Sequence, residues 1–158
     1  MPESLEAVLV GATRSALEKT AFLFAEPGTP EAMPGDAVEA AVVATVAFAG
    51  SHHGAFSIAF PARLLPVLAV NVLGEDDAPD DATQRDALGE LANIICGNVL
   101  PALNPEGKYS LGPPSVGGVS AAVAPDSVRV ARGDMQVEGE KIEASLWLSA
   151  PGTPAGPA

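Results

Sequence analysis

The sequence predicts an α+β fold in which two long helices and a short helix pack on an antiparallel-rich sheet. Two segments, residues 3–24 and 83–103, carry apolar residues at helical spacing. Residues 38–60 and 127–148 instead contain pairs of short strand-like runs, the first of them rich in Val and Ala, and each pair is separated by a glycine-containing turn. Because each long helix precedes a strand pair, the chain is expected to be a degenerate repeat of a helix-strand-strand unit.

The first half is expected to run from a long helix through a linker to a hairpin. The helical spacing begins near Leu5 and extends to Phe24, and the Pro- and Gly-rich residues 27–35 then end the helix. The two strands and their turn are expected at Val38–Phe48, Ala55–Phe60 and Gly50–Gly54. A short helix follows, with Pro61 as its first residue and its end near Leu73.

The second half is expected to consist of the second long helix, an irregular turn and further strands. Asp80 or Asp81 can cap that helix at its start. A Gly- and Pro-rich turn is expected over residues 104–118. The strands are expected at Val119–Val123, Ser127–Val137 and Lys141–Leu148, the last two joined by a tight turn at Glu138-Gly139.

Composition limits the function classes. We expect residues 1–149 of the 158 to form one domain and the Pro/Gly/Ala tail, 150–158, to be disordered. No apolar run is long enough for a bilayer and no export signal is visible, so we expect a cytoplasmic protein with no membrane partner. Twenty acidic against eight basic residues give a net charge of -12, which argues against nucleic acid.

A metal site of the chain's own is not expected. Cys96 is the only cysteine, so an internal disulfide and a cysteine metal cluster are both ruled out, and a small helix residue is the simpler interpretation. His52 and His53 fall in the predicted hairpin turn, where an exposed tip is favoured because no converging ligand can be named.

The second long helix carries the most informative pattern. At about 100° per residue, Asp86, Glu90, Asn93 and Gly97 project within an arc of roughly 60°. The opposite side is expected to be buried and consists of Leu88, Leu91, Ala92, Ile95, Val99 and Ala102. Asparagine and glycine are poor residues for a helix interior, so Asn93, Gly89 and Gly97 are expected where another backbone approaches closely.

The residues that carry a family resemblance are Asp86-x-x-x-Glu90-x-x-Asn93, the following Ile-Ile-x-Gly97, and Pro113-Pro114. This pattern resembles the signature of the CheC, CheX and FliY phosphatases, and CheX in particular. The likeness covers most of residues 3–149. Family members with two active helices have Glu-x-x-Asn twice, whereas the first helix here has Glu18-Lys-Thr-Ala21, so the resemblance implies one site per chain.

The resemblance implies an enzyme that dephosphorylates the phospho-aspartate of a response-regulator receiver domain. Asn93 would orient the attacking water, and Glu90 would pair with the lysine of the receiver. Asp86 and Gly97, together with Pro113 and Pro114, would contact the partner or shape the loop beside the helix. The chain would need no cofactor, since the receiver supplies Mg²⁺. Sheet-mediated homodimers are also implied.

Two other interpretations stay open. A non-catalytic module of the same fold would bind a phosphorylated receiver or a motor-switch component without turnover, because fold alone does not fix activity. A purely structural subunit would form a homodimer and bind no receiver. A classical hydrolase is a weaker third, since the sequence has no Gly-x-Ser-x-Gly and no phosphate-binding Gly-rich loop.

Overall fold

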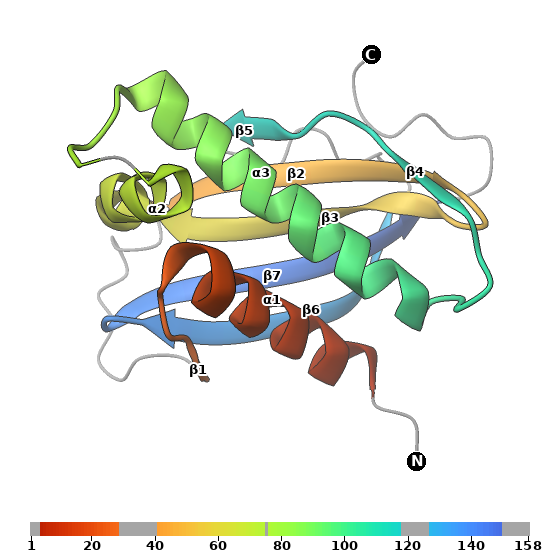
Figure 1. The fold of residues 1–158 in the computed structure, drawn as a ribbon. Helices are drawn as coiled ribbons and strands as arrows, with labels where there is room; N and C mark the ends of the chain where they lie inside the picture. Colours follow the sequence, from red (N-terminus) through yellow and green to blue (C-terminus); the bar gives the residue numbers. More distant parts are fainter. Residues whose placement is uncertain (1–3, 29–40, 75, 118–126, 150–158) are drawn as a thin grey trace.

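The computed structural model describes residues 4–28, 41–74, 76–117 and 127–149, and these form a seven-stranded antiparallel sheet with three α-helices over one face (Figure 1). The predicted α+β class is therefore confirmed. Within these ranges, no helix is both long and apolar enough to span a membrane. The predicted strand at 119–123 and the predicted disordered tail at 150–158 lie outside the described residues, as does most of the predicted linker.

Helix α1 (Leu5–Ala21) is shorter than the spacing predicted. It begins at Ser4, whose hydroxyl accepts a hydrogen bond from the Ala7 N–H. It ends because Phe22 adopts a left-handed conformation with φ 54°. Phe24 is therefore not a buried helical residue, as its spacing suggested, but lies beyond the helix with 69% of its surface exposed.

Two long hairpins form the sheet: β2 (Ala41–Gly50) with β3 (His53–Pro61), and β6 (Val128–Val137) with β7 (Glu140–Ser149). They meet at the centre, where β3 pairs with β7. The turn between β6 and β7 has positive φ at both Glu138 (51°) and Gly139 (77°), as a two-residue type I′ turn requires. Both hairpins and this turn were predicted.

The sequence did not indicate three short strands at the edges of the sheet. They are β1 (Glu26–Pro27), β4 (Tyr109–Leu111) and β5 (Ser115–Gly117). β1 pairs with β6 at one edge, and β4 and β5 both pair with β2 at the other. The segment predicted as an irregular turn, 104–118, thus contains β4 and β5 (Figure 1).

Each long helix packs on the strand pair that follows the other long helix in the sequence. α1 packs on β6, whereas α3 (Asp81–Val99) packs on β2, so each long helix covers the hairpin of the other helix-strand-strand unit. The short helix α2 (Leu65–Leu73) lies against α3 and is preceded by a 3-10 turn, Ala62–Leu64. Pro61 is the last residue of β3 and not the first helical residue.

The core lies between the helices and the inner face of the sheet. Its largest fully buried side chains include Phe48, Phe56 and Phe60 from the β2–β3 hairpin, with Leu17 from α1 and Leu88 from α3. Burial of an apolar side chain of this size stabilises the fold by about 1.5–3 kcal/mol. Core packing therefore holds one side of α3 against the sheet, and residues on the opposite side are exposed to solvent.

Candidate functional site

The start of α3 is fixed by a side-chain cap. The Asp80 carboxylate accepts a hydrogen bond of 2.9 Å from the Thr83 N–H, as predicted for this position. Hydrogen bonding from the Thr83 side chain and backbone holds the pKa of Asp80 below its ordinary value. This cap fixes the residue at which the helix begins.

The buried side of α3 agrees with the predicted stripe except at its end. The buried residues are Ala87, Leu88, Gly89, Leu91, Ala92, Ile95, Cys96 and Val99. Ala102 was expected to join them but is exposed, because the helix tightens into a 3-10 turn at Leu100–Ala102 and the spacing changes. Cys96 is fully buried, and this burial raises the pKa of its thiol to about 12.

The opposite side of α3 brings the four predicted residues together. Asp86, Glu90 and Gly97 are exposed, and Asn93 is half-buried between them. Neither carboxylate forms an ion pair with another described residue. This face therefore presents two free carboxylates and an amide at successive turns of the helix, with Glu90 one turn from each of the other two.

The side-chain amide of Asn93 is free of internal partners. Its Oδ1 atom is buried and has no hydrogen-bond partner, and its Nδ2 atom donates to no other described residue. Leaving a buried polar atom unpaired costs about 1–3 kcal/mol. Folding alone gives no reason for an asparagine here, whereas a bound water or ligand would supply the missing hydrogen bonds.

Gly89 serves the packing of this chain and not the approach of a partner. A Cβ atom at Gly89 would lie 3.0 Å from Cγ and 3.1 Å from Cβ of Pro114, and 3.4 Å from a methyl group of Val116. Gly89 is also buried. Gly89 was expected on the exposed face, where another molecule would approach, and this was wrong: its missing side chain lets β5 and the proline before it pack against the helix.

Pro113 and Pro114 form the irregularity that brings this edge strand onto α3. Leu111 pairs with Phe48 and Ser115 pairs with Thr45, so three residues of the edge segment oppose two of β2. Proline cannot donate a ladder hydrogen bond, which places the pair naturally at such a bulge. Pro114 then lies against Gly89, one turn before Asn93. The prolines thus shape the loop beside the helix, and their contact with a partner stays a prediction.

Gly97 differs from Gly89 in having free space around it. It is exposed, and a Cβ atom there would meet nothing within 4 Å. No internal contact explains the glycine. Close approach of another molecule stays the explanation that we predict for this position.

Sequence reasoning missed a cluster next to Gly97. Tyr109 of β4 lies near the end of α3, and its hydroxyl is 2.7 Å from Nδ1 of His52. The two histidines were expected at an exposed hairpin tip, but both are half-buried. The sequence does not indicate this contact, because His52 and Tyr109 are far apart in sequence and meet only through the pairing of β2 with β4.

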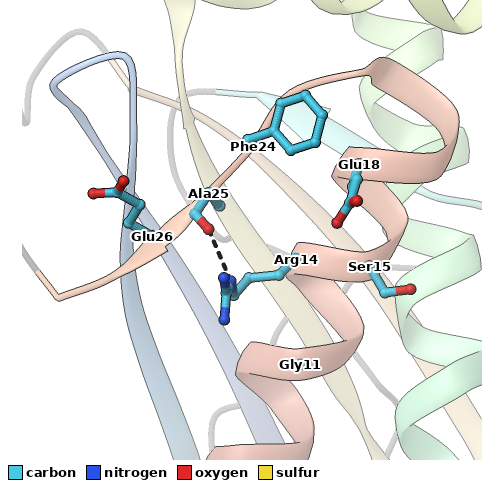
Figure 2. Close-up of a pocket in the computed structure, with 7 residues that line it drawn as sticks. All are labelled: Gly11, Arg14, Ser15, Glu18, Phe24, Ala25 and Glu26. Carbon is cyan, nitrogen blue, oxygen red and sulfur yellow. Dashed lines mark hydrogen bonds between the residues drawn. The ribbon is translucent and has the colours of Figure 1, made fainter.

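A cleft beside helix α1 is lined in part by charged residues. The cleft, of about 450 Å³, lies between α1 and the segment leading into β1, and its lining includes Arg14, Glu18 and Phe24 (Figure 2). Arg14 donates from Nε to the Ala25 carbonyl at 2.8 Å, the dashed line in Figure 2. Ala21, three residues after Glu18, is fully buried, so this helix could not present a Glu-x-x-Asn pair there.

A metal-binding cluster is not found in the described part of the chain. Among those residues, no three His, Cys, Asp or Glu side chains gather closely enough to hold a metal ion. The chemistry available on α3 is therefore that of a carboxylate and an amide, which can pair with a cation and orient a water.

The family model for the chemotaxis phosphatase CheX matches residues 42–124, which is more than half of the chain. The chain belongs to the CheX family. The matched residues include all of α3 and both strands, β4 and β5, that border its exposed face. No curated protein sequence matches the chain.

Solved structures of CheX proteins share the fold. The chemotaxis protein CheX from Desulfovibrio desulfuricans is 21% identical with a TM-score of 0.68, covering 92% of this chain and 99% of its own. CheX from Vibrio vulnificus is 17% identical with a TM-score of 0.70 and coverages of 94% and 99%. CheX in a CheX-CheY-BeF₃-Mg²⁺ complex from Borrelia burgdorferi is 20% identical, with a TM-score of 0.64 and coverages of 93% and 99%.

Proposed function

We propose that this CheX-family protein hydrolyses the phospho-aspartate of a CheY-like receiver domain, using Glu90 and Asn93. The observation that carries the proposal is the Asn93 amide. It lies on the exposed side of a helix whose other side is buried, and its oxygen has no internal hydrogen-bond partner. The Borrelia relative, whose structure was solved with CheY, BeF₃ and Mg²⁺, supports a receiver as the partner.

Asn93 would position the water that attacks phosphorus. Because Oδ1 is buried in the free protein, the side chain would rotate on binding so that Oδ1 accepts a hydrogen bond from the water while Nδ2 donates to a phosphoryl oxygen, which holds the water in line for attack. Phosphoryl transfer depends mainly on positioning and charge stabilisation. Mg²⁺ and the lysine of the receiver would supply the charge stabilisation, so the chain needs no metal or strongly basic side chain of its own.

Glu90 would fix the register of α3 on the receiver. Its exposed carboxylate has no internal cation partner in the described residues and is free to pair with the lysine of the receiver. Asp86, one turn earlier on the same face, adds negative charge toward a basic partner surface. Asp86 and Gly97 are also proposed to face the partner, and Pro113 and Pro114, which are exposed in the loop beside the helix, to border the same contact. A homodimer formed through the sheet stays a prediction.

Phosphate release from a charged receiver tests the proposal. A panel of receivers is phosphorylated with a small-molecule donor and Mg²⁺, the donor is removed, and release is followed with wild type, Asn93→Ala and Asn98→Ala. Loss of one water-orienting group should slow the step about 100-fold, or about 2.7 kcal/mol. Asn98 is a matched control because it is an exposed asparagine of the same helix.

A third variant, Glu90→Ala, helps to separate catalysis from binding. Wild-type acceleration that Asn93→Ala abolishes and Asn98→Ala keeps would support hydrolysis by this pair. Glu90→Ala should mainly raise the receiver concentration needed for half-maximal rate. Binding of the phosphorylated receiver without any acceleration of its decay would refute the phosphatase proposal and favour the non-catalytic module.

A further inference from the structure

A small pocket adjoins the exposed face of α3 at its C-terminal end. Its volume is about 200 Å³, and its lining includes Gly97, Leu100, Pro101, Tyr109 and Leu111. None of the lining residues is charged. This uncharged lining distinguishes this end of the face from the end that carries Asp86 and Glu90.

The walls of the pocket are fixed before any partner binds. The Tyr109 ring makes an edge contact with Phe48 at a centroid distance of 5.9 Å, and its hydroxyl is 2.7 Å from His52 Nδ1. A Cβ atom at Gly107 would lie 3.0 Å from the Tyr109 ring, so the loop before β4 packs directly on it. The Lys108 N–H also donates to Ser51 Oγ at 3.1 Å. A preorganised pocket loses little entropy on binding.

Leu111 supplies an exposed apolar wall at the rim. It retains 36% exposure although it pairs with buried Phe48 in the sheet ladder. Gly97, also in the lining, has no side chain, and a Cβ atom added there would meet nothing within 4 Å. Gly97 thus links the pocket to the side of α3 that carries Asn93, because the four-residue step from Asn93 to Gly97 rises only about 6 Å along the helix.

We propose that this pocket receives an apolar side chain of the receiver domain, beside the phosphorylated aspartate. The inference rests on the proposed function and deepens it. The face of α3 then has two poles, with Asn93 between them. Its acidic pole, Asp86 and Glu90, matches a basic group of the receiver, and its uncharged pole at Gly97 and Leu111 matches an apolar one. Such a two-pole match fixes the orientation of the partner and makes the pocket a specificity determinant.

A cysteine footprint at the rim tests the occupant directly. Cys96 is fully buried with a pKa raised to about 12, so a Leu111→Cys variant should carry a single reactive thiol. The rate of its alkylation is measured with increasing amounts of a receiver that wild type dephosphorylates, held in the active state with beryllofluoride and Mg²⁺. Val130→Cys on β6, where the valine is 42% exposed at the far edge of the sheet, is the matched control.

Saturating receiver should slow alkylation at position 111 at least about tenfold and leave position 130 unchanged. Equal rates with and without bound receiver would overturn the proposal. Protection that grows with the concentration of the variant itself, in the absence of receiver, would also overturn it, because a second copy would then be the occupant.

Kinetics give an independent readout. Leu111→Ser should raise the KM for the phosphorylated receiver about tenfold and leave kcat close to wild type, because Glu90 and Asn93 are untouched. An unchanged KM in Leu111→Ser, together with loss of turnover in Asn93→Ala, would refute the pocket while the phosphatase proposal stands. If wild type accelerates the decay of no receiver, the proposed function itself fails, and the pocket inference with it.

Discussion

Replacing Gly97 by alanine should make the protein more stable and less active. A Cβ atom there meets nothing within 4 Å, so the methyl group fits the free protein without strain. Alanine is favoured over glycine in a helix by up to about 1 kcal/mol, and a position in the last turn should realise about half of that. For a domain of this size, such a gain raises Tm by about 1–2 °C.

The loss of activity follows from the same methyl group. If the receiver approaches the Gly97 backbone at contact distance, a carbon atom placed in that space displaces it by about 1 Å, and a misplacement of this size can cost about 100-fold in rate. We expect kcat/KM for phosphate release to fall at least about tenfold. Gly11→Ala on α1 is the matched control, because Gly11 is also exposed with nothing within 4 Å of a Cβ. A Gly97→Ala enzyme with wild-type kcat/KM would refute close approach at this position.

Three further predictions concern the folded chain. Cys96 should resist alkylation at pH 8 and react only after unfolding, because burial raises the pKa of its thiol to about 12; mass spectrometry of native and denatured samples checks this. Asp80→Ala should lower Tm near neutral pH, and the difference in Tm from wild type should disappear in acid. Folding lowers the pKa of Asp80, so the stabilisation by its carboxylate is present above the ordinary carboxyl pKa and is lost as the pH falls through the lowered value. Glu138→Asn should stabilise the β6–β7 hairpin by about 0.5–1 kcal/mol in denaturant melts, because asparagine tolerates the positive φ at this position better than glutamate, and an unchanged midpoint would contradict the reasoning.

The long elements could be predicted because their signals are local. Helical spacing, the Asp80 cap and the Glu138-Gly139 turn each depend on residues close in sequence, and all three are found in the structure. The end of α1 was misjudged because the apolar spacing continues to Phe24, whereas the chain leaves the helix at Phe22 through a left-handed backbone. Spacing alone does not report that backbone change.

The short edge strands could not be predicted from the sequence, because their own residues do not favour strands. β4 and β5 have three residues each and are separated by Gly112, Pro113 and Pro114, a composition typical of a turn. They form strands because their backbones pair with the edge of β2. The pocket at Tyr109 depends on the same pairing, so the sequence indicated the acidic end of the α3 face but not its apolar end.

Some residues of α3 lower the stability of the helix, and only some of these make an internal contact that accounts for them. This difference separates the candidate site from residues that serve packing alone. Gly89 is costly in a helix, and contact with Pro114 explains it. Asn93 and Gly97 are also costly, yet no internal contact explains the unpaired amide oxygen of the first or the missing side chain of the second. Both lie on the exposed side with Glu90, one turn apart. Residues that weaken the free protein and share one face are expected where a partner supplies the missing contacts, and this argument reaches Asn93 and the face that carries Glu90 without using the family resemblance.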